Sequence, residues 1–295
     1  MKSHFFKVAA IAALSLSAIA SCQKAGADNS STTNAPTEIN MTTPDTISAK
    51  VLVNTNMGSF TVLLYGDTPK HRDNFLRLAK EGYYDGTLFH RVIKDFMIQA
   101  GDPDSKNAAP EAHLGAGGPN YKIDAEIVFP KHFHKRGALA AARQGDQVNP
   151  MKQSSGSQFY IVTGNVFGQA DLGRIERQLQ GAKTQQIFNE LSLANRDSII
   201  EMQRKGDRNG LTALRDSLIK QTEDAVAKLP SQLTQEMKEA YTTVGGAPHL
   251  DGQYSVFGEI IDGMDVVDKI EKVETGSADR PKEDVKIISM KVLAE

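Results

Sequence analysis

Cysteine is almost absent from this chain of 295 residues: Cys22 is the only one, so no disulfide can form within the chain. An excess of charge is also lacking, because the formal net charge is -2 and the isoelectric point is near 6.4. Proteins that bind nucleic acid usually carry a concentrated basic surface, so we expect no nucleic-acid partner. The residues also include no set that indicates a cofactor. Hydrophobic residues make up 40% of the chain, which is ample for one large core or two small ones.

A long hydrophobic run is missing too. The apolar stretch at residues 8–20 is shorter than the roughly 20 residues that a membrane-spanning helix needs. Because it follows two lysines near the N-terminus, it fits a secretory signal. Residues 19–22, Ile-Ala-Ser-Cys, resemble the lipobox of bacterial lipoproteins, with isoleucine where leucine is usual. The resemblance implies cleavage before Cys22 and acylation of its thiol. The alternative is an ordinary signal peptide cut near Ala20, which leaves a free thiol.

We therefore expect a lipoprotein signal peptide over residues 1–21 and a flexible tether over residues 22–46. The tether is rich in Ser, Thr, Asn, Ala and Pro, and such a segment cannot offset its own ordering entropy. A flexible chain of this length reaches roughly 25 to 30 Å on average. The lipid bilayer would be a partner through acylated Cys22. We expect the protein in the bacterial cell envelope, lipid-anchored and facing the periplasm or the cell surface.

The residues after the tether predict a β-hairpin and then a helix. Two β-branched runs at 47–55 and 59–65 are separated by Asn-Met-Gly, in which the glycine suits a left-handed turn. Asp67-Thr68-Pro69 then offers a capping side chain and a proline for the first helical turn, and Gly82 ends the helix.

The most informative stretch is residues 87–103. Its apolar residues are enough to bury two short strands with a bend at Lys94-Asp95. Arg91 and Gln99 then remain unexplained, because a guanidinium is charged at any accessible pH and an amide buried alone is costly. These two side chains are candidates for a site that holds a partner peptide.

Three sequence blocks support this interpretation. They are Phe89-His90-Arg91 with Phe96-Met97-Ile98-Gln99-Ala100-Gly101-Asp102, then Gly156-Ser157-Gln158-Phe159-Tyr160-Ile161, and last His249-Leu250-Asp251-Gly252 with Val256-Phe257-Gly258. In this order the blocks resemble the signature of the cyclophilins, and an ordered set is far more specific than one short match. The resemblance implies a mainly β fold in residues 47–295, a closed eight-stranded antiparallel cyclophilin-like barrel capped by two helices. The second of these helices would run from Asp262 through Ile270.

The resemblance also implies which residues do the work. Arg91 would be the catalytic donor. The implied substrate-binding residues are Phe96, Met97, Gln99, Ala142, Arg143, Gln158, Tyr160, His249, Leu250 and Tyr254. Four apolar or aromatic members, at positions 96, 97, 160 and 250, would form a proline pocket, and the two glutamines would bond peptide backbone and the arginine. Positions 142 and 143 fall where the family presents its own backbone to the peptide. Tyrosine replaces a common phenylalanine at 160, histidine a tryptophan at 249, and tyrosine a frequent histidine at 254.

Two other patterns were open to a different interpretation. The glycine-rich loop at 115–119 could cradle a phosphate, but no Lys-Ser/Thr follows and the strand-loop-helix context is missing. The resemblance instead places this loop at the rim of the substrate groove. His113, His132 and His134 could suggest a metal, yet no carboxylate or cysteine completes a set nearby. We therefore predict no metal site.

Between the second and third blocks the chain inserts roughly seventy residues more than a compact cyclophilin, a length unlikely to lack structure. We place this insertion at residues 166–243. Apolar residues at helical spacing predict helices over 171–205 and 211–229 around a turn at 206–210, and a shorter helix over 231–241. We expect a helical hairpin beside the groove. Its role is open between passive decoration and the binding of a client or partner protein.

These observations predict a peptidyl-prolyl cis/trans isomerase that acts on X-Pro bonds of exported proteins and assists their folding. Amide resonance gives such bonds a rotation barrier of about 18 to 20 kcal/mol. A guanidinium beside the prolyl nitrogen would favour the twisted amide, in which that nitrogen regains its lone pair. Two alternatives remain. One is a module that binds proline-containing segments without catalysis, and the other is a scaffold lipoprotein that works through the insertion.

Overall fold

The computed structural model describes residues 48–229 and 233–293. The expected signal peptide (1–21), Cys22 and the tether (22–46) lie outside the described residues. Within the described ranges, no helix is both long and apolar enough to cross a bilayer.

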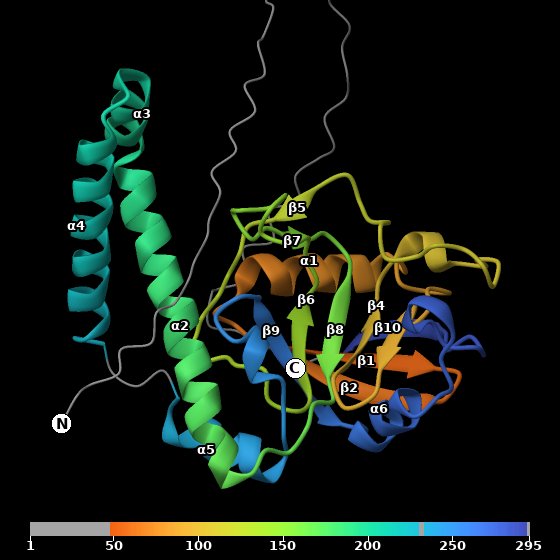
Figure 1. Ribbon diagram of the computed structural model, residues 1–295. Coiled ribbons are helices and arrows are strands. Elements are labelled where there is room, and N and C mark those ends of the chain that lie inside the picture. The colour runs from red at the N-terminus through yellow and green to blue at the C-terminus, as the bar shows by residue number, and fades with distance from the viewer. Residues whose placement is uncertain (1–47, 230–232, 294–295) are drawn as a thin grey trace, which may run out of the picture. The chain divides into compact units, whose positions relative to one another are not determined.

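An eight-stranded antiparallel sheet forms the centre of the described part of the chain. Its strands follow the order β10-β1-β2-β9-β6-β8-β4-β3 (Figure 1). The expectation of eight antiparallel strands is confirmed. These strands are β1 (Ala49–Thr55), β2 (Gly58–Leu64), β3 (Arg91–Ile93), β4 (Met97–Ala100), β6 (Ala138–Ala141), β8 (Phe159–Val162), β9 (Val256–Asp262) and β10 (Ile287–Leu293). A separate small sheet pairs β5 (Lys122–Ile123) with β7 (Ser154–Ser155).

The large sheet curls, but in the described residues its edge strands β3 and β10 do not share a ladder. The segment just before β3 makes the contact with the start of β10 instead. The Phe89 amide donates to the Val285 carbonyl, and the Ile287 amide donates to the Thr87 carbonyl, both at 2.8 Å. The result is a half-barrel in place of the closed barrel that the sequence predicted. The reason is that the pairing of the two edges is limited to the isolated bridge between Leu88 and Lys286, which precedes both the residues of β3 and those of β10.

Two helices pack on different parts of this sheet. α1 (Pro69–Lys80) contacts β1, β9 and β10, whereas α6 (Met264–Glu271) contacts β2, β3 and β4. In Figure 1 one helix lies above the sheet and the other lies below it. Both helices fall where the sequence predicted them.

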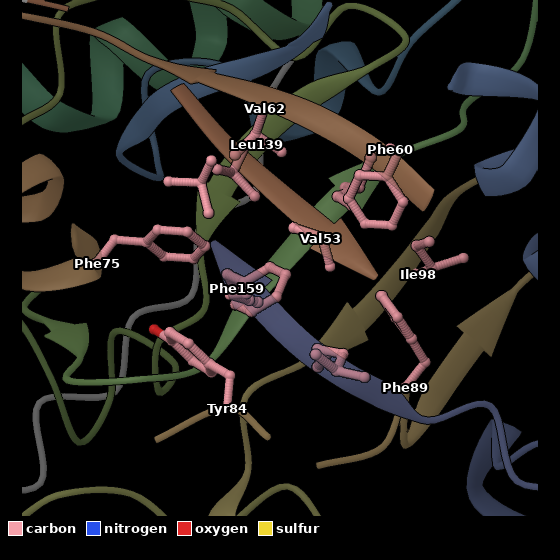
Figure 2. Close-up of a cluster of buried hydrophobic side chains, with 14 of the residues drawn as sticks. Val53, Phe60, Val62, Phe75, Tyr84, Phe89, Ile98, Leu139 and Phe159 are labelled. Carbon is pink, nitrogen blue, oxygen red and sulfur yellow. The ribbon is translucent and has the colours of Figure 1, made fainter. Parts of the chain in front are cut away.

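The main hydrophobic core lies between the inner face of the sheet and these helices. Alternate residues of β1, such as Val51 and Val53, point into it and are almost fully buried. The ring of Phe75 on α1 meets the rings of Tyr84 and Phe159, with centroids 5.2 and 5.4 Å apart (Figure 2). This core fixes the central strands, whose opposite face carries the candidate site.

Helices fill the described part of the insertion. They are α2 (Gln169–Ala194), α3 (Arg196–Lys205), α4 (Arg208–Val226) and α5 (Gln235–Thr243). α2 and α4 run side by side, and α3 lies at their far end (Figure 1). The described structure therefore has about 38% helix and 22% strand, and the expected mainly β class is corrected for these described residues.

The turn between α3 and α4 is shorter than the predicted 206–210. Gly206 ends α3 in the left-handed conformation, with φ of 67°. Asp207 then starts α4, because its side chain accepts a hydrogen bond from the Gly210 amide at 2.8 Å.

The last helix begins later than expected, after Thr234, whose hydroxyl caps α5.

A small apolar cluster joins the insertion to the rest of the fold. Ile175 of α2 packs there with Met237 and Tyr241 of α5 and with Phe133. α2 also contacts the short 3₁₀ helix η2 (Pro248–Leu250). The insertion thus lies against the third sequence block.

The start of α1 is capped by a residue that the sequence did not suggest. In the described structure the side chain of Thr68 forms no capping hydrogen bond. The Glu126 carboxylate instead accepts from the amides of Lys70 and His71, both at 3.0 Å, and lies 2.6 Å from His71 Nδ1. His71 Nε2 lies 2.9 Å from Ser154 Oγ. Because Ser154 is 1% exposed, a substrate cannot reach this row of serine, histidine and glutamate side chains. The row therefore has a structural role.

Glu126→Ala is expected to lower the free energy of unfolding by about 1–3 kcal/mol at neutral pH, because two helix amides and a buried imidazole lose their acceptor. Burial by itself raises the pKa of Glu126. The bonds from His71 and from the Lys70 amide outweigh burial, so the pKa lies below its ordinary value of 4.5. The stability difference should be complete above pH 4.5 and should shrink as the pH falls through the folded-state pKa. Urea unfolding at a series of pH values measures it.

The matched control is Asp124→Ala. This carboxylate is 65% exposed and pairs with a lysine on the surface, so its removal should change stability little. Equal stability of the wild type and Glu126→Ala at neutral pH would contradict the capping role.

Candidate functional site

The sheet face that points away from the main core carries a second apolar cluster. Along β8, Phe159 and Ile161 face the main core, whereas Tyr160 and Val162 face this outer cluster. β6 contributes only alanines to it, and such small side chains leave room above the strand. The predicted substrate-binding residues in this cluster are Phe96, Met97, Ala142, Tyr160, Leu250 and Tyr254.

A line of polar side chains borders the outer cluster. The strand register pairs Arg91 with Gln99, and Gln99 with Tyr160. Arg91 Nη1 donates to Gln99 Oε1 at 3.5 Å, and Gln99 Nε2 donates to Gln158 Oε1 at 3.1 Å. Gln158 Nε2 in turn donates to the Gly117 carbonyl at 2.7 Å. The glutamines therefore orient one another and hold the arginine at the edge of the cluster.

Arg91 is also held by a residue that sequence analysis missed. Its Nε lies 3.4 Å from Oδ2 of Asp279, at the end of the 3₁₀ helix η3 (Ser277–Asp279). The arginine side chain remains 42% exposed. A guanidinium has five N–H donors, so these bonds leave donors for a ligand.

Aromatic contacts bring the other predicted residues to the same surface. The His249 ring packs against the ring of Phe96, with centroids 5.1 Å apart. This contact leaves part of His249 exposed, and the burial of the rest lowers its pKa. The Arg143 guanidinium lies 4.5 Å from the ring centroid of Tyr254. Cation–π geometry of this kind occupies the Arg143 side chain within the protein.

The main chain of Ala142 already forms hydrogen bonds within the protein. Its amide donates to the Gln158 carbonyl at 3.0 Å, and its carbonyl accepts from the Ser155 amide at 2.8 Å. Because a carbonyl oxygen can accept twice, the expected peptide contact at Ala142 is confined to that oxygen.

Behind Tyr160 lies a buried polar network. The Tyr160 hydroxyl is 2.9 Å from His134 Nε2. The His134 amide and Nδ1 are 2.8 and 2.9 Å from Asp251 Oδ1, and the Tyr241 hydroxyl donates to Asp251 Oδ2. Sequence analysis missed this network, although the extra hydroxyl at position 160 was a signal, because a buried hydroxyl usually has a partner.

The three histidines considered for a metal are not brought together. His132 Nε2 lies 2.7 Å from Asp67 Oδ1, and its ring stacks on Tyr65 at 4.0 Å. His134 belongs to the buried network. Across residues 48–229 and 233–293, no group of three or more His, Cys, Asp or Glu side chains is placed to hold a metal ion.

Comparison with known proteins places this geometry in a family. Residues 50–184 and 222–292 match the family described as cyclophilin type peptidyl-prolyl cis-trans isomerase/CLD. A Staphylococcus aureus protein, provisionally named a peptidyl-prolyl cis-trans isomerase, is 31% identical over 245 residues, which cover 82% of this chain and 91% of that protein. The match identifies the protein as a peptidyl-prolyl cis-trans isomerase. The chain belongs to the cyclophilin-type family of these enzymes.

Two further similarities were found. A Streptococcus pyogenes protein, provisionally named a bifunctional phosphatase/peptidyl-prolyl cis-trans isomerase, is 34% identical over 248 residues, but the chain spans only 38% of its length. The crystal structure of a Cryptosporidium parvum cyclophilin-type isomerase has 21% identity and a TM-score of 0.49 over 84% of this chain and 99% of that chain.

Proposed function

We propose that the outer cluster binds an X-Pro segment and that Arg91 lowers the barrier to rotation about its imide bond. The observation that carries the proposal is the strand register, which places Arg91 and Gln99 in one row with the pocket residue Tyr160. The half-exposed guanidinium of Arg91 lies next to the partly buried outer cluster. This combination suits a proline-containing peptide, which has an apolar pyrrolidine ring and a polar backbone.

The chemistry needs no bond to be broken. Only a contact that is stronger with the twisted imide than with the planar one accelerates rotation. When the imide twists, the prolyl nitrogen regains its lone pair and can accept a hydrogen bond from the Arg91 guanidinium. Every 1.4 kcal/mol of this preference is worth about tenfold in rate.

The neighbouring residues have separate roles in this proposal. Phe96, Met97, Tyr160 and Leu250 hold the proline ring, because they belong to one apolar cluster in which Phe96 and Leu250 are only partly buried. The Gln99 and Gln158 amides bond the peptide backbone, a role supported by their own bonds to Arg91 and Gly117, which fix their orientation. His249 and Tyr254 lie at the margin, next to Phe96 and Arg143 respectively.

The test is a coupled assay in which a protease cleaves only the trans form of an X-Pro peptide. The proposal expects the wild type to accelerate cis-to-trans rotation and the loss of Arg91 to abolish most of that acceleration. Binding of the peptide without acceleration would favour a non-catalytic proline-binding module. Capture of a partner through the insertion alone would favour the scaffold alternative.

We further propose that the substrates are exported proteins met at the cell envelope. The support is the N-terminal sequence, where an apolar stretch is followed by Ile-Ala-Ser-Cys at residues 19–22. An acylated cysteine would hold the catalytic domain near the membrane without a spanning helix.

Cys22→Ser is expected to lose lipid labelling, because the serine cannot accept the acyl chain that lipoprotein processing adds to a cysteine thiol. Labelling of cells with a palmitate analogue measures the change. Ser21→Ala is the matched control, since it alters the neighbouring residue and keeps the thiol. Equal labelling of Cys22→Ser and the wild type, or no labelling of either, would contradict the anchor.

A further inference from the structure

Hydrogen bonds connect the helical insertion to the candidate proline pocket. They start at Tyr241 on α5, pass through Asp251 and His134, and end at the hydroxyl of Tyr160. All four residues are at most 5% exposed. The connection joins an element outside the compact cyclophilin sheet to an aromatic ring of the outer cluster.

With Asp251 ionised and the His134 ring neutral, the chemistry of the groups gives the direction of each bond. A carboxylate only accepts, so Asp251 receives hydrogens from the Tyr241 hydroxyl and from the amide and Nδ1 of His134. With the ring hydrogen on Nδ1, Nε2 accepts from the Tyr160 hydroxyl. Burial raises the pKa of both tyrosine hydroxyls, so both remain protonated donors.

The geometry leaves each side chain little freedom. Asp251 holds His134 at two points, the amide and Nδ1, and so fixes the plane of the imidazole. The Tyr160 ring lies nearly parallel to that imidazole, at 11° with centroids 6.0 Å apart. Bonds in such a buried chain reinforce one another, and loss of one leaves the next group without its partner.

We propose that Tyr241, Asp251 and His134 are positioning residues of the isomerase, through which α5 of the insertion sets the place of the Tyr160 ring against the substrate proline. The inference rests on the proposed function, because Tyr160 contacts substrate only if the X-Pro segment binds to the outer cluster. It gives the insertion a role in the site itself, separate from any capture of client proteins.

A double-mutant cycle with Tyr241→Phe and Tyr160→Phe tests the proposal, because each change removes one hydroxyl and keeps the ring. Tyr241→Phe alone should raise KM for an X-Pro peptide by about threefold to tenfold, with a smaller change in kcat. In the Tyr160→Phe background the same change should raise KM by less than about twofold, because the connection is already broken. Equal effects of Tyr241→Phe in both backgrounds, or no effect in either, would overturn the proposal.

Met237→Leu is the matched control for damage to α5. Met237 is fully buried on the same helix in the cluster that joins α5 to α2, and leucine nearly conserves its volume. This variant should leave KM unchanged. A rise in KM equal to that of Tyr241→Phe would assign the effect to loose packing of the insertion and would overturn the role of the hydroxyl.

A spectroscopic measurement decides the connection without any activity. With ¹⁵N-labelled histidine, the His134 nitrogen shifts should move in Tyr160→Phe and also in Tyr241→Phe, and Met237→Leu should leave them in place. Unchanged His134 shifts in Tyr241→Phe would overturn the proposal. If the wild type lacked isomerase activity, the proposed function would fail, while these shifts would still show whether α5 and Tyr160 are coupled.

Discussion

Arg91→Ala is expected to lower kcat/KM for an X-Pro peptide by about 100-fold to 1,000-fold, the usual cost of removing one donor that acts on the transition state. The loss should fall mainly on kcat, because the proposed bond to the prolyl nitrogen forms only when the imide is twisted. Stability should hardly change. Arg91 is 42% exposed, and its bonds to Asp279 and Gln99 are long, at 3.4 and 3.5 Å.

The protease-coupled assay measures this loss, and thermal unfolding checks the fold. Arg77→Ala is the matched control, because Arg77 is 47% exposed, pairs with Glu81 and lies on α1 away from the outer cluster. Arg91→Lys keeps the charge without the planar fork of donors, so intermediate activity is expected. A loss below about tenfold in Arg91→Ala would remove this residue from the proposed catalytic role.

The second large effect concerns stability. Asp251→Ala is expected to lower the free energy of unfolding by about 3–5 kcal/mol, because three buried donors lose their acceptor and each such loss costs about 1–3 kcal/mol. The Asp251 side chain is 0% exposed and accepts bonds from two groups of His134 and from Tyr241. In the variant those donors stay buried without an acceptor.

Urea unfolding measures the change. Asp251→Asn keeps the size and one acceptor oxygen, so it should lose less stability than the alanine variant. Glu201→Ala removes a carboxylate that is 66% exposed and pairs with the equally exposed Lys205, so it serves as the surface control, with little change expected. A loss below about 1 kcal/mol in Asp251→Ala would mean that water replaces the missing acceptor and that the network does not hold this part of the fold.

The arrangement of the insertion bears on how the site is built. α2 contacts η2, which carries His249 and Leu250, and α5 contributes Tyr241 to the buried network. Within the insertion, the part that the family match leaves out is residues 185–221, at the outer end of the hairpin. The base of the insertion therefore lies against the candidate site.

Local patterns in the sequence predicted much of this fold. Two apolar, β-branched runs and the glycine turn between them marked β1 and β2, and the proline at position 69 marked the start of α1. Arg91 and Gln99 stood out because no local role explained them, and the ordered blocks indicated the remaining candidate residues. These signals are readable because strand and helix periodicity repeats over a few residues.

The sequence by itself thus determined the first hairpin, the two helices that pack on the sheet, the polar pair on β3 and β4, and six members of the outer cluster. Only the tertiary structure decided which distant groups meet: Glu126 at the start of α1, Asp279 beside Arg91, and Tyr241 with Asp251 behind the Tyr160 ring. The tertiary structure likewise shows a curled half-barrel in place of the expected closed barrel, because the two sheet edges meet at an isolated bridge before β3 begins. The reason is physical. A hydrogen bond between residues far apart in the chain depends on where loops and helices pack, and no local periodicity encodes that position.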